Sequence, residues 1–324
     1  MLVLSRADLE RVLDPVAVIE AVASAFREAA AGRAAALPRA VLSIAKDGFF
    51  VGMISALPRR RALGAKLVTV MPGNRARGLP TLHASYVLGD PETGAPLAFM
   101  EAGFLTAMRT GAASAVAAKY LARPDSRRVV CFGAGFQAEF QLRCLQAVLP
   151  LESVAVVGRD PARAWAFAER MRGVLGVPIE ITRDRRGAVR EADLVTCATT
   201  SPRPVFAGRD LSPGTHVDAV GAFRPATREL DTDAVKRAHV VVDTYHGAWT
   251  EAGDLLIPIK ARAITRRHVK AELAEIVAGK KRGRTRPDEI TLFKSVGWAP
   301  EDAASARLAY DRAVARGIGT EVCL

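Results

Sequence analysis

A glycine-rich turn that directly follows an apolar run constrains the fold of this 324-residue chain more than any other feature. The run Val129–Phe132 leads into Gly133-Ala134-Gly135-Phe136-Gln137-Ala138, and a helix-like segment follows to Leu149. In a strand–turn–helix unit, the first glycine permits the tight turn and the second lets a pyrophosphate approach the backbone. An ordinary glycine turn would not need the small third residue, Ala138. The segment Gly133–Ala138 therefore predicts the phosphate-binding loop of a nicotinamide dinucleotide site.

The pattern around this turn predicts the fold class, which is α/β. Strand-like runs alternate with helix-like segments near residues 129–132, 153–157, 178–181, 194–198, 216–220 and 240–243. This rhythm is typical of a Rossmann-type doubly wound parallel sheet. The preceding stretch has two capped helix starts, at Ser5 and Asp14, and then strand-like runs between residues 40 and 100 with a turn at 46–48. It predicts an α+β domain, joined to the sheet by a long helix at about 102–123.

The end of the second strand-like run bears on the choice of cofactor. It reads Val156-Val157-Gly158-Arg159-Asp160. A carboxylate at this strand tip usually binds the ribose 2′-hydroxyl of NAD, whereas an arginine accommodates the 2′-phosphate of NADP. Because Arg159 comes first and Arg163 follows within a helical turn, NADPH is favoured over NADH. The alternative is that Arg159 stacks on the adenine and Asp160 holds the ribose of NAD.

Three cations interrupt apolar patterns in the first part of the chain. Lys66 shares a strand face with Val68 and Val70, and Arg109 lies on an apolar helix stripe with no acidic residue within a turn. A buried cation without a partner is costly, so each should meet an anion. A structural salt bridge is the simplest partner for either one alone. Together with Arg39, which precedes the first long strand, they favour a bound carboxylate or phosphate.

Composition excludes several classes of protein. The net charge is +12, with a basic run at residues 280–286, but no aromatic residue interleaves with it, so a solvated loop is favoured over a nucleic-acid patch. The four cysteines and five histidines show no metal-ligand spacing, and we expect no metal site. No apolar run approaches the roughly 18 residues of a membrane span. With no signal-like start, a cytoplasmic protein is expected.

Motifs along nearly the whole chain resemble those of the ornithine cyclodeaminase/mu-crystallin family. The matching stretches are Gly64–Val68, Met71–Asn74, Leu79–Thr81, Met108–Ala113, Gly133–Ala138, Val220–Ala222, Glu251–Leu255 and Thr291–Gly297. The resemblance implies a homodimer in which residues 1–120 with 299–324 bind substrate and pair subunits. Residues 121–298 would then form the dinucleotide-binding domain.

The resemblance also implies roles for single residues. Arg39, Lys66 and Arg109 would bind the substrate carboxylate, with Lys66 as the catalytic residue for proton transfer. The cofactor would be lined, beyond the glycine-rich turn and strand tip, by Thr81, Arg109, Thr199, Val220 and Ser295.

One departure from the family pattern bears on the reaction. Cyclodeaminases of this family carry an aspartate shortly after the Val-Gly pair, where this chain has Phe223. Phenylalanine cannot exchange a proton, but it could form a wall beside the ring of a cyclic imine and so contribute to substrate binding. The stretch resembles the mu-crystallin and ketimine-reductase branch. Cyclodeamination is therefore disfavoured unless Glu251 or Asp254 takes over the acid/base task.

We therefore expect an NADPH-dependent oxidoreductase that reduces the C=N bond of cyclic ketimino acids. The substrates would be Δ1-pyrroline-2-carboxylate or Δ1-piperideine-2-carboxylate, and the products L-proline or L-pipecolate. One alternative is an ornithine or lysine cyclodeaminase or an alanine dehydrogenase. Another is a mu-crystallin-type protein that binds NADPH and a small ligand with little turnover.

Overall fold

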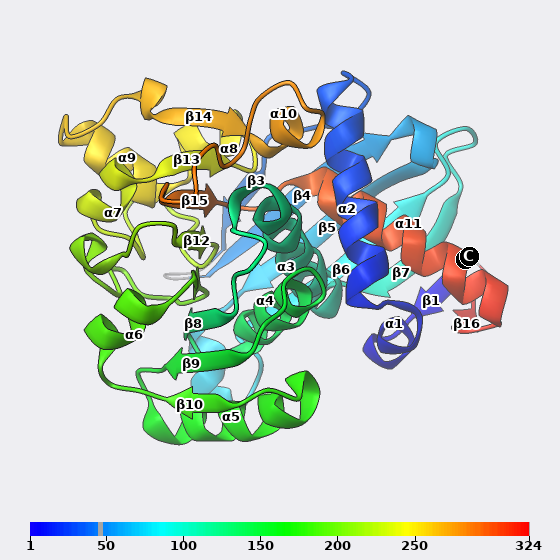
Figure 1. Ribbon diagram of the computed structural model, residues 1–324. Coiled ribbons are helices and arrows are strands. Elements are labelled where there is room, and N and C mark those ends of the chain that lie inside the picture. Colours follow the sequence, from blue (N-terminus) through cyan, green and yellow to red (C-terminus); the bar gives the residue numbers. More distant parts are fainter. Residues whose placement is uncertain (45–47, 324) are drawn as a thin grey trace. The chain divides into compact units, whose positions relative to one another are not determined.

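The computed structural model describes residues 1–44 and 48–323 of the chain, which divides into two compact units (Figure 1). Unit 1 comprises Met1–Arg109 and Ala299–Leu324, and unit 2 comprises Thr110–Trp298. The predicted roles of the two parts stay predictions. Most of the turn predicted at residues 46–48 lies outside the described residues. No helix among the described residues is long and apolar enough to cross a membrane.

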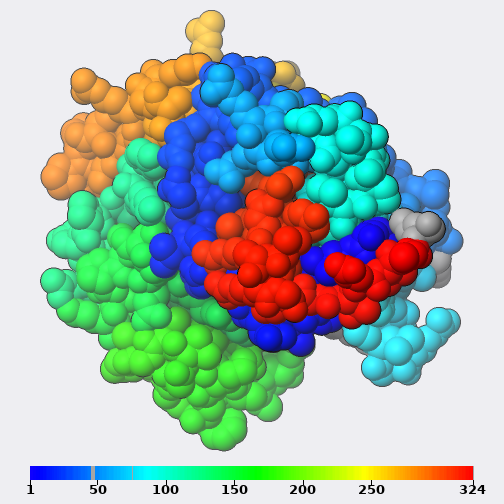
Figure 2. Space-filling view, turned by 90° about the vertical axis from the view of Figure 1, so that its right-hand side faces the viewer, coloured from blue at the N-terminus to red at the C-terminus, as the bar shows by residue number. Residues whose placement is uncertain are grey.

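Unit 1 is an α+β unit built on one mixed sheet. Its strands are β1 (Leu2–Leu4), β2 (Ala35–Ala36), β3 (Ala40–Ser43), β4 (Phe49–Leu57), β5 (Ala62–Val70), β6 (Leu82–Gly89), β7 (Pro96–Glu101) and β16 (Thr320–Glu321). They follow the order β16-β1-β7-β6-β5-β4-β2, with β3 also paired to β4. Figure 2 shows the C-terminal segment beside the N-terminal strand, in agreement with the β1–β16 pairing. The helices are α1 (Arg6–Val12), α2 (Pro15–Ala30), the start of α3 (Ala102–Leu121) and α11 (Ala299–Arg316).

The two faces of the unit 1 sheet differ. One row of paired residues, Met53, Lys66, Tyr86, Met100 and Leu4, is buried. Helix α11 packs on strands β4 and β5 and against α2, and its alanines allow close approach (Figure 1). Side chains alternate along a strand, so the neighbouring row of residues points to the other face of the sheet. This row consists of Ile54, Ala65, Val87 and Phe99. Ile54 and Phe99 are 46% and 40% exposed.

Unit 2 is a doubly wound sheet in which every strand pair is parallel. Its order is β10-β9-β8-β11-β12-β15-β13-β14. The strands are β8 (Arg128–Phe132), β9 (Ser153–Val157), β10 (Ile179–Ile181), β11 (Leu194–Cys197), β12 (His216–Ala219), β13 (His239–Val242), β14 (Val269–Glu272) and β15 (Thr291–Lys294). The helices are α4 (Phe136–Gln146), α5 (Pro161–Leu175), α6 (Arg185–Glu191), α7 (Thr232–Arg237), α8 (Tyr245–Thr250), α9 (Gly253–Lys260) and α10 (Leu273–Val277). The predicted fold class is confirmed.

Candidate functional site

The glycine-rich turn joins β8 to α4 in unit 2, as the sequence predicts. Gly133 has φ +116°, and a Cβ there would lie 2.5 Å from the carbonyl oxygen of Ala198. At Gly135, by contrast, a Cβ would meet nothing within 4 Å, so the backbone is open to a ligand. Gly135 is also the N-cap of α4, and no side chain in the described part of the chain caps this helix. The turn therefore fits a pyrophosphate, which a helix N-terminus stabilises through its N–H groups and dipole.

The turn lies at the topological switch point of the sheet. From β8 the chain proceeds to β9 and β10 on one side, and then to β11 and β12 on the other. Ligands of such sheets bind beyond the carboxyl ends of the strands at this point. Thr199 follows β11 there, and Val220 follows β12. The structure thus brings these two predicted cofactor residues to the same sheet edge as the glycine-rich turn.

A buried carboxylate that was not predicted from the sequence binds both loops that follow β11 and β12. Glu229 is fully buried. Its Oε1 accepts from the N–H and hydroxyl of Thr199 (2.6 and 2.7 Å), and its Oε2 accepts from the N–H groups of Gly221 and Ala222 (2.7 and 3.2 Å). Burial raises the pKa of Glu229, while the charge of Lys294 opposes that shift.

Two further carboxylates hold the segments around the switch point. Asp254, fully buried, accepts from the N–H groups of Glu229 and Leu230 (both 2.8 Å) and pairs with Lys294 Nζ at 2.9 Å. These contacts give Asp254 a structural role, which argues against it as the acid/base substitute for the missing aspartate. The hydroxyl of Ser295, a predicted cofactor residue, donates to Asp243 (2.9 Å).

The tip of the second strand separates Arg159 from Asp160. The Asp160 side chain is the N-cap of α5 and accepts from the N–H groups of Ala162 and Arg163 (3.0 and 3.2 Å). Arg159 is exposed. The carboxylate expected to hold the ribose of NAD is therefore engaged in capping a helix.

The predicted cations of unit 1 meet two carboxylates from the far end of the chain. Lys66, 1% exposed, donates from Nζ to Oδ1 and Oδ2 of Asp302 (2.9 and 2.8 Å). Arg109, 4% exposed, donates from Nε to Asp302 (2.9 Å) and from Nη1 to Glu301 (2.7 Å). We call Lys66, Arg109, Glu301 and Asp302 the charge cluster. The sequence favoured a ligand anion as the partner of Lys66 and Arg109. In the structure, protein carboxylates are their partners.

The electrostatics of the charge cluster place all three predicted cations near one another. Burial and the positive charges of Arg109 and Arg39, opposed by Asp302, lower the pKa of Lys66 to about 8. Although burial opposes it, the charges of Arg109 and Lys66 hold the pKa of Asp302 below its ordinary value. Lys66 therefore titrates near neutral pH, as a proton-transfer group should.

Two other predicted residues, Phe223 and Thr81, lie outside helices and strands. Phe223, 38% exposed, follows β12 in unit 2, with the Arg224 guanidinium 5.8 Å from its ring centre. Thr81 lies just before β6 in unit 1, where its carbonyl accepts from the N–H of Met71 (2.7 Å). In the basic run, Arg284 donates to backbone carbonyls, including that of Leu121 (2.7 Å), so this arginine has a structural role.

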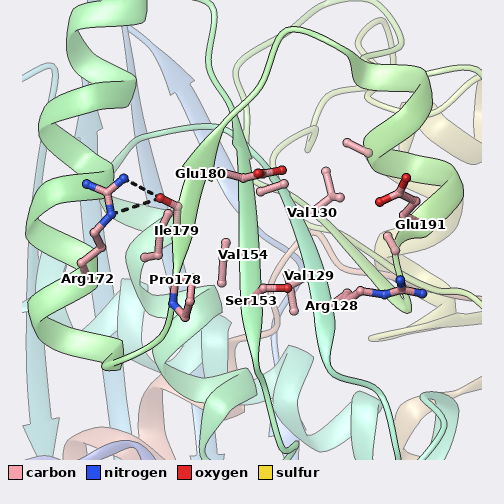
Figure 3. Close-up of a pocket in the computed structure, with 13 residues that line it drawn as sticks. Arg128, Val129, Val130, Ser153, Val154, Arg172, Pro178, Ile179, Glu180 and Glu191 are labelled. Atoms are coloured by element: carbon pink, nitrogen blue, oxygen red, sulfur yellow. Dashed lines mark hydrogen bonds between the residues drawn. The ribbon is translucent and has the colours of Figure 1, made fainter.

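A cavity of about 390 Å³ in unit 2 contains none of the predicted site residues. It is lined by β8, β9 and β10 with Arg172 of α5 and Glu191 of α6 (Figure 3). Arg128 and Ser153, among its lining residues, begin β8 and β9. Since parallel sheets bind cofactors beyond the opposite, carboxyl ends of their strands, we do not assign this cavity to the dinucleotide.

Comparisons with known proteins agree along the whole chain. The model of the ornithine cyclodeaminase/mu-crystallin family matches residues 1–317. A Δ1-pyrroline-2-carboxylate reductase of Bacillus cereus is 38% identical, over 99% of this chain and 99% of that protein. The structure of the Thermococcus litoralis Δ1-pyrroline-2-carboxylate reductase with NADH and L-proline has a TM-score of 0.97 at 46% identity, covering 99% of this chain and all of that one. An archaeal alanine dehydrogenase dimer with bound NAD has a TM-score of 0.94 at 34% identity, covering 100% and 99%.

Proposed function

The chain belongs to the ornithine cyclodeaminase/mu-crystallin family, and we propose that it is an NAD(P)H-dependent reductase of cyclic ketimino acids. The substrates are Δ1-pyrroline-2-carboxylate or Δ1-piperideine-2-carboxylate, reduced to L-proline or L-pipecolate. The observation that carries the proposal is the buried pair Lys66 and Arg109, both cationic and adjacent to Arg39. The glycine-rich turn supports the cofactor, and relatives named as reductases support the reaction.

The residues of unit 1 are assigned to the substrate. The reduced nicotinamide supplies, when bound, the hydride that saturates the C=N bond. Arg109 uses Nε and Nη1 for protein carboxylates, so its Nη2 group, with Arg39, is assigned to the substrate carboxylate. The Lys66 ammonium gives a proton to the substrate nitrogen, which balances the hydride added to carbon. Asp302 holds Lys66 in place for that transfer.

Activity measurements test this proposal directly. We expect oxidation of NADPH or NADH when the purified protein receives either cyclic imine. L-Ornithine and L-alanine serve as comparison substrates, because relatives of this family include cyclodeaminases and an alanine dehydrogenase. No turnover above background with either imine would contradict the proposal. Ammonia release from ornithine, or net reduction of NAD by alanine, would favour one of the alternatives.

NADPH is the preferred cofactor in this proposal. Asp160 caps α5, and the exposed guanidinium of Arg159 is the charged group at the strand tip. An arginine at this position can bind a 2′-phosphate, which NAD lacks. The relatives described above contain NADH or NAD, so the preference is a property we assign to this chain. A lower KM for NADPH than for NADH is the expected result.

The face of the unit 1 sheet that carries Ile54 and Phe99 is assigned to a homodimer interface. Ile54 on β4 and Phe99 on β7, separated by two strands in one row, give this face exposed apolar side chains that a partner would cover. Light scattering should give the mass of a dimer for the wild-type protein. Phe99→Glu should shift it toward monomer, because a carboxylate at a paired interface is left unpaired. A dimeric Phe99→Glu protein would place the interface elsewhere.

A further inference from the structure

One side chain ties together the two loops that follow β11 and β12. Glu229 accepts from both donors of Thr199 in the first loop and from the N–H groups of Gly221 and Ala222 in the second. Three of these four distances are 2.7 Å or less, as expected when the acceptor carries a charge. Glu229 itself lies between β12 and α7, so one side chain links the loop after β11 to the loop after β12 and sets their separation.

The packing around Glu229 leaves little room for the loops to move. A Cβ on Gly221 would lie 2.5 Å from Oε1 of Glu229 and 2.2 Å from the carbonyl oxygen of Thr199. Asp254 fixes the backbone of Glu229 from behind, and Lys294, which pairs with Asp254, donates to the carbonyl of Ala219 at 3.1 Å. Both ends of the Glu229 side chain are therefore held.

A carboxylate is the only common side chain that satisfies these contacts. Its two oxygens offer about four acceptor positions, which equals the four donors of Thr199, Gly221 and Ala222. A glutamine of the same size would turn an N–H₂ group toward two of those donors. Two buried N–H or O–H groups would then lose their acceptor, and the loops would be free to separate.

We propose that Glu229 is a positioning residue for hydride transfer, which sets the loops carrying Thr199 and Val220 at the edge where the dinucleotide binds. This inference rests on the proposed function, in which these loops line the cofactor. Glu229 itself touches neither cofactor nor substrate in this scheme. It acts through the peptide groups and the hydroxyl that it binds, since small errors in the placement of reacting groups cost large factors in rate.

The test compares Glu229→Gln with Asp193→Asn in the full-length protein. Asp193 is the matched control, because it also accepts from two backbone N–H groups, those of Arg127 and Arg128 (both 2.9 Å), but it directly precedes β11 at the amino end of the sheet. Both variants should lower the melting temperature. Only Glu229→Gln should raise the dissociation constant for NADH, measured by fluorescence titration, by about tenfold and lower kcat by about tenfold or more.

The outcomes distinguish this inference from the proposed function. A Glu229→Gln protein that binds NADH and turns over within about twofold of wild type, with a melting temperature lowered like that of Asp193→Asn, would overturn the inference. If Glu229→Gln does not fold, Thr199→Val, which removes the hydroxyl that donates to Glu229 and accepts from the N–H of Ser201, should weaken NADH binding about threefold, and wild-type affinity would overturn the inference. A wild-type protein that reduces no cyclic imine contradicts the proposed function, and the NADH titrations still decide the role of Glu229.

Discussion

The dinucleotide turn of unit 2 and the charge cluster of unit 1 are built in opposite ways. The turn is one continuous segment, and its chemistry is carried by backbone that glycine leaves bare at Gly135. The charge cluster is assembled from residues 66, 109 and 301–302, with every charged group buried. The function of a continuous segment can be predicted from the spacing of its residues. For a cluster assembled from distant residues, the sequence shows only charged residues with no oppositely charged neighbour nearby in the chain.

Because of this difference, cofactor binding and substrate chemistry can be tested separately. If unit 2 binds the cofactor and the charge cluster serves the substrate, variants of the two regions should affect different measured constants. Substitutions of Lys66 and Asp302 in the charge cluster should lower kcat and leave the affinity for NADH unchanged. Substitutions at the strand tip near Arg159 should change the KM of the cofactor and leave kcat unchanged.

Lys66→Met should give the largest effect. The thioether side chain fills the space of the lysine stem but carries no proton, so kcat for imine reduction should fall by about a hundredfold to ten-thousandfold. Binding of NADH, followed by fluorescence titration, should stay within about twofold of wild type. If NADH binding fell in parallel with kcat, the separation between the two regions would be broken.

Asp302→Asn should give the next largest effect, and it has a pH signature. In the wild type, kcat/KM should fall as pH rises through about 8, where Lys66 loses its proton. Without the Asp302 charge, burial and the charges of Arg109 and Arg39 lower the pKa of Lys66 further, so the decline should move to lower pH. Glu301 and Tyr86, the other titratable groups near Asp302, are unchanged in the variant.

The same substitution should also destabilise the protein. Removing one partner of a buried ion pair costs about 3–5 kcal/mol, because the other charge stays buried. Asp311→Asn, which breaks the more exposed pair of Asp311 with Arg307 on the same helix, is the matched control and should cost less than about 1 kcal/mol. An unchanged pH profile in Asp302→Asn would show that Lys66 does not depend on this carboxylate.

Most of the architecture could be predicted from the sequence because local signals agree with the fold. The capping box of Ser5 with Asp8 and the Asp14 cap begin α1 and α2 as expected. Strand parity placed Lys66 on the buried face, beside Tyr86 of the neighbouring strand. In contrast, β14 was missed because its alternation of apolar and charged residues covers only four positions, too few for a strong strand signal.

The partners of the site residues could not be predicted in the same way. Glu301 and Asp302 lie in the first turn of α11, where acidic residues are expected for helix stability alone. Only the packing of α11 on β4 and β5 brings them to Lys66, 236 positions away in the chain. Glu229 gave no local signal either, since its four donors come from two loops that meet only in the folded sheet.

Arg159→Ala tests the other side of the comparison, with a moderate effect. Loss of the guanidinium should raise the KM for NADPH about tenfold, because the 2′-phosphate loses a charged partner, and leave the KM for NADH within about twofold. Arg170→Ala, on the exposed side of α5, is the control and should change neither constant. Equal changes for both cofactors would mean that Arg159 stacks on the adenine, and NADPH would lose its preferred status.

Asp218→Asn should give the smallest effect. It tests whether a buried carboxylate must have a functional role. Asp218 is fully buried on β12, with His216 Nε2 at 3.4 Å. Burial raises the pKa of this carboxyl, so stability falls as pH rises from the ordinary aspartate pKa of 3.8 toward that raised pKa, and the loss stays constant above it. The asparagine has no charge to desolvate. Urea unfolding should therefore find the variant more stable by about 1 kcal/mol at about pH 8, with the difference shrinking as pH falls toward about 4. A variant less stable than wild type at both pH values would give the ionised Asp218 a stabilising role like that of the charge cluster.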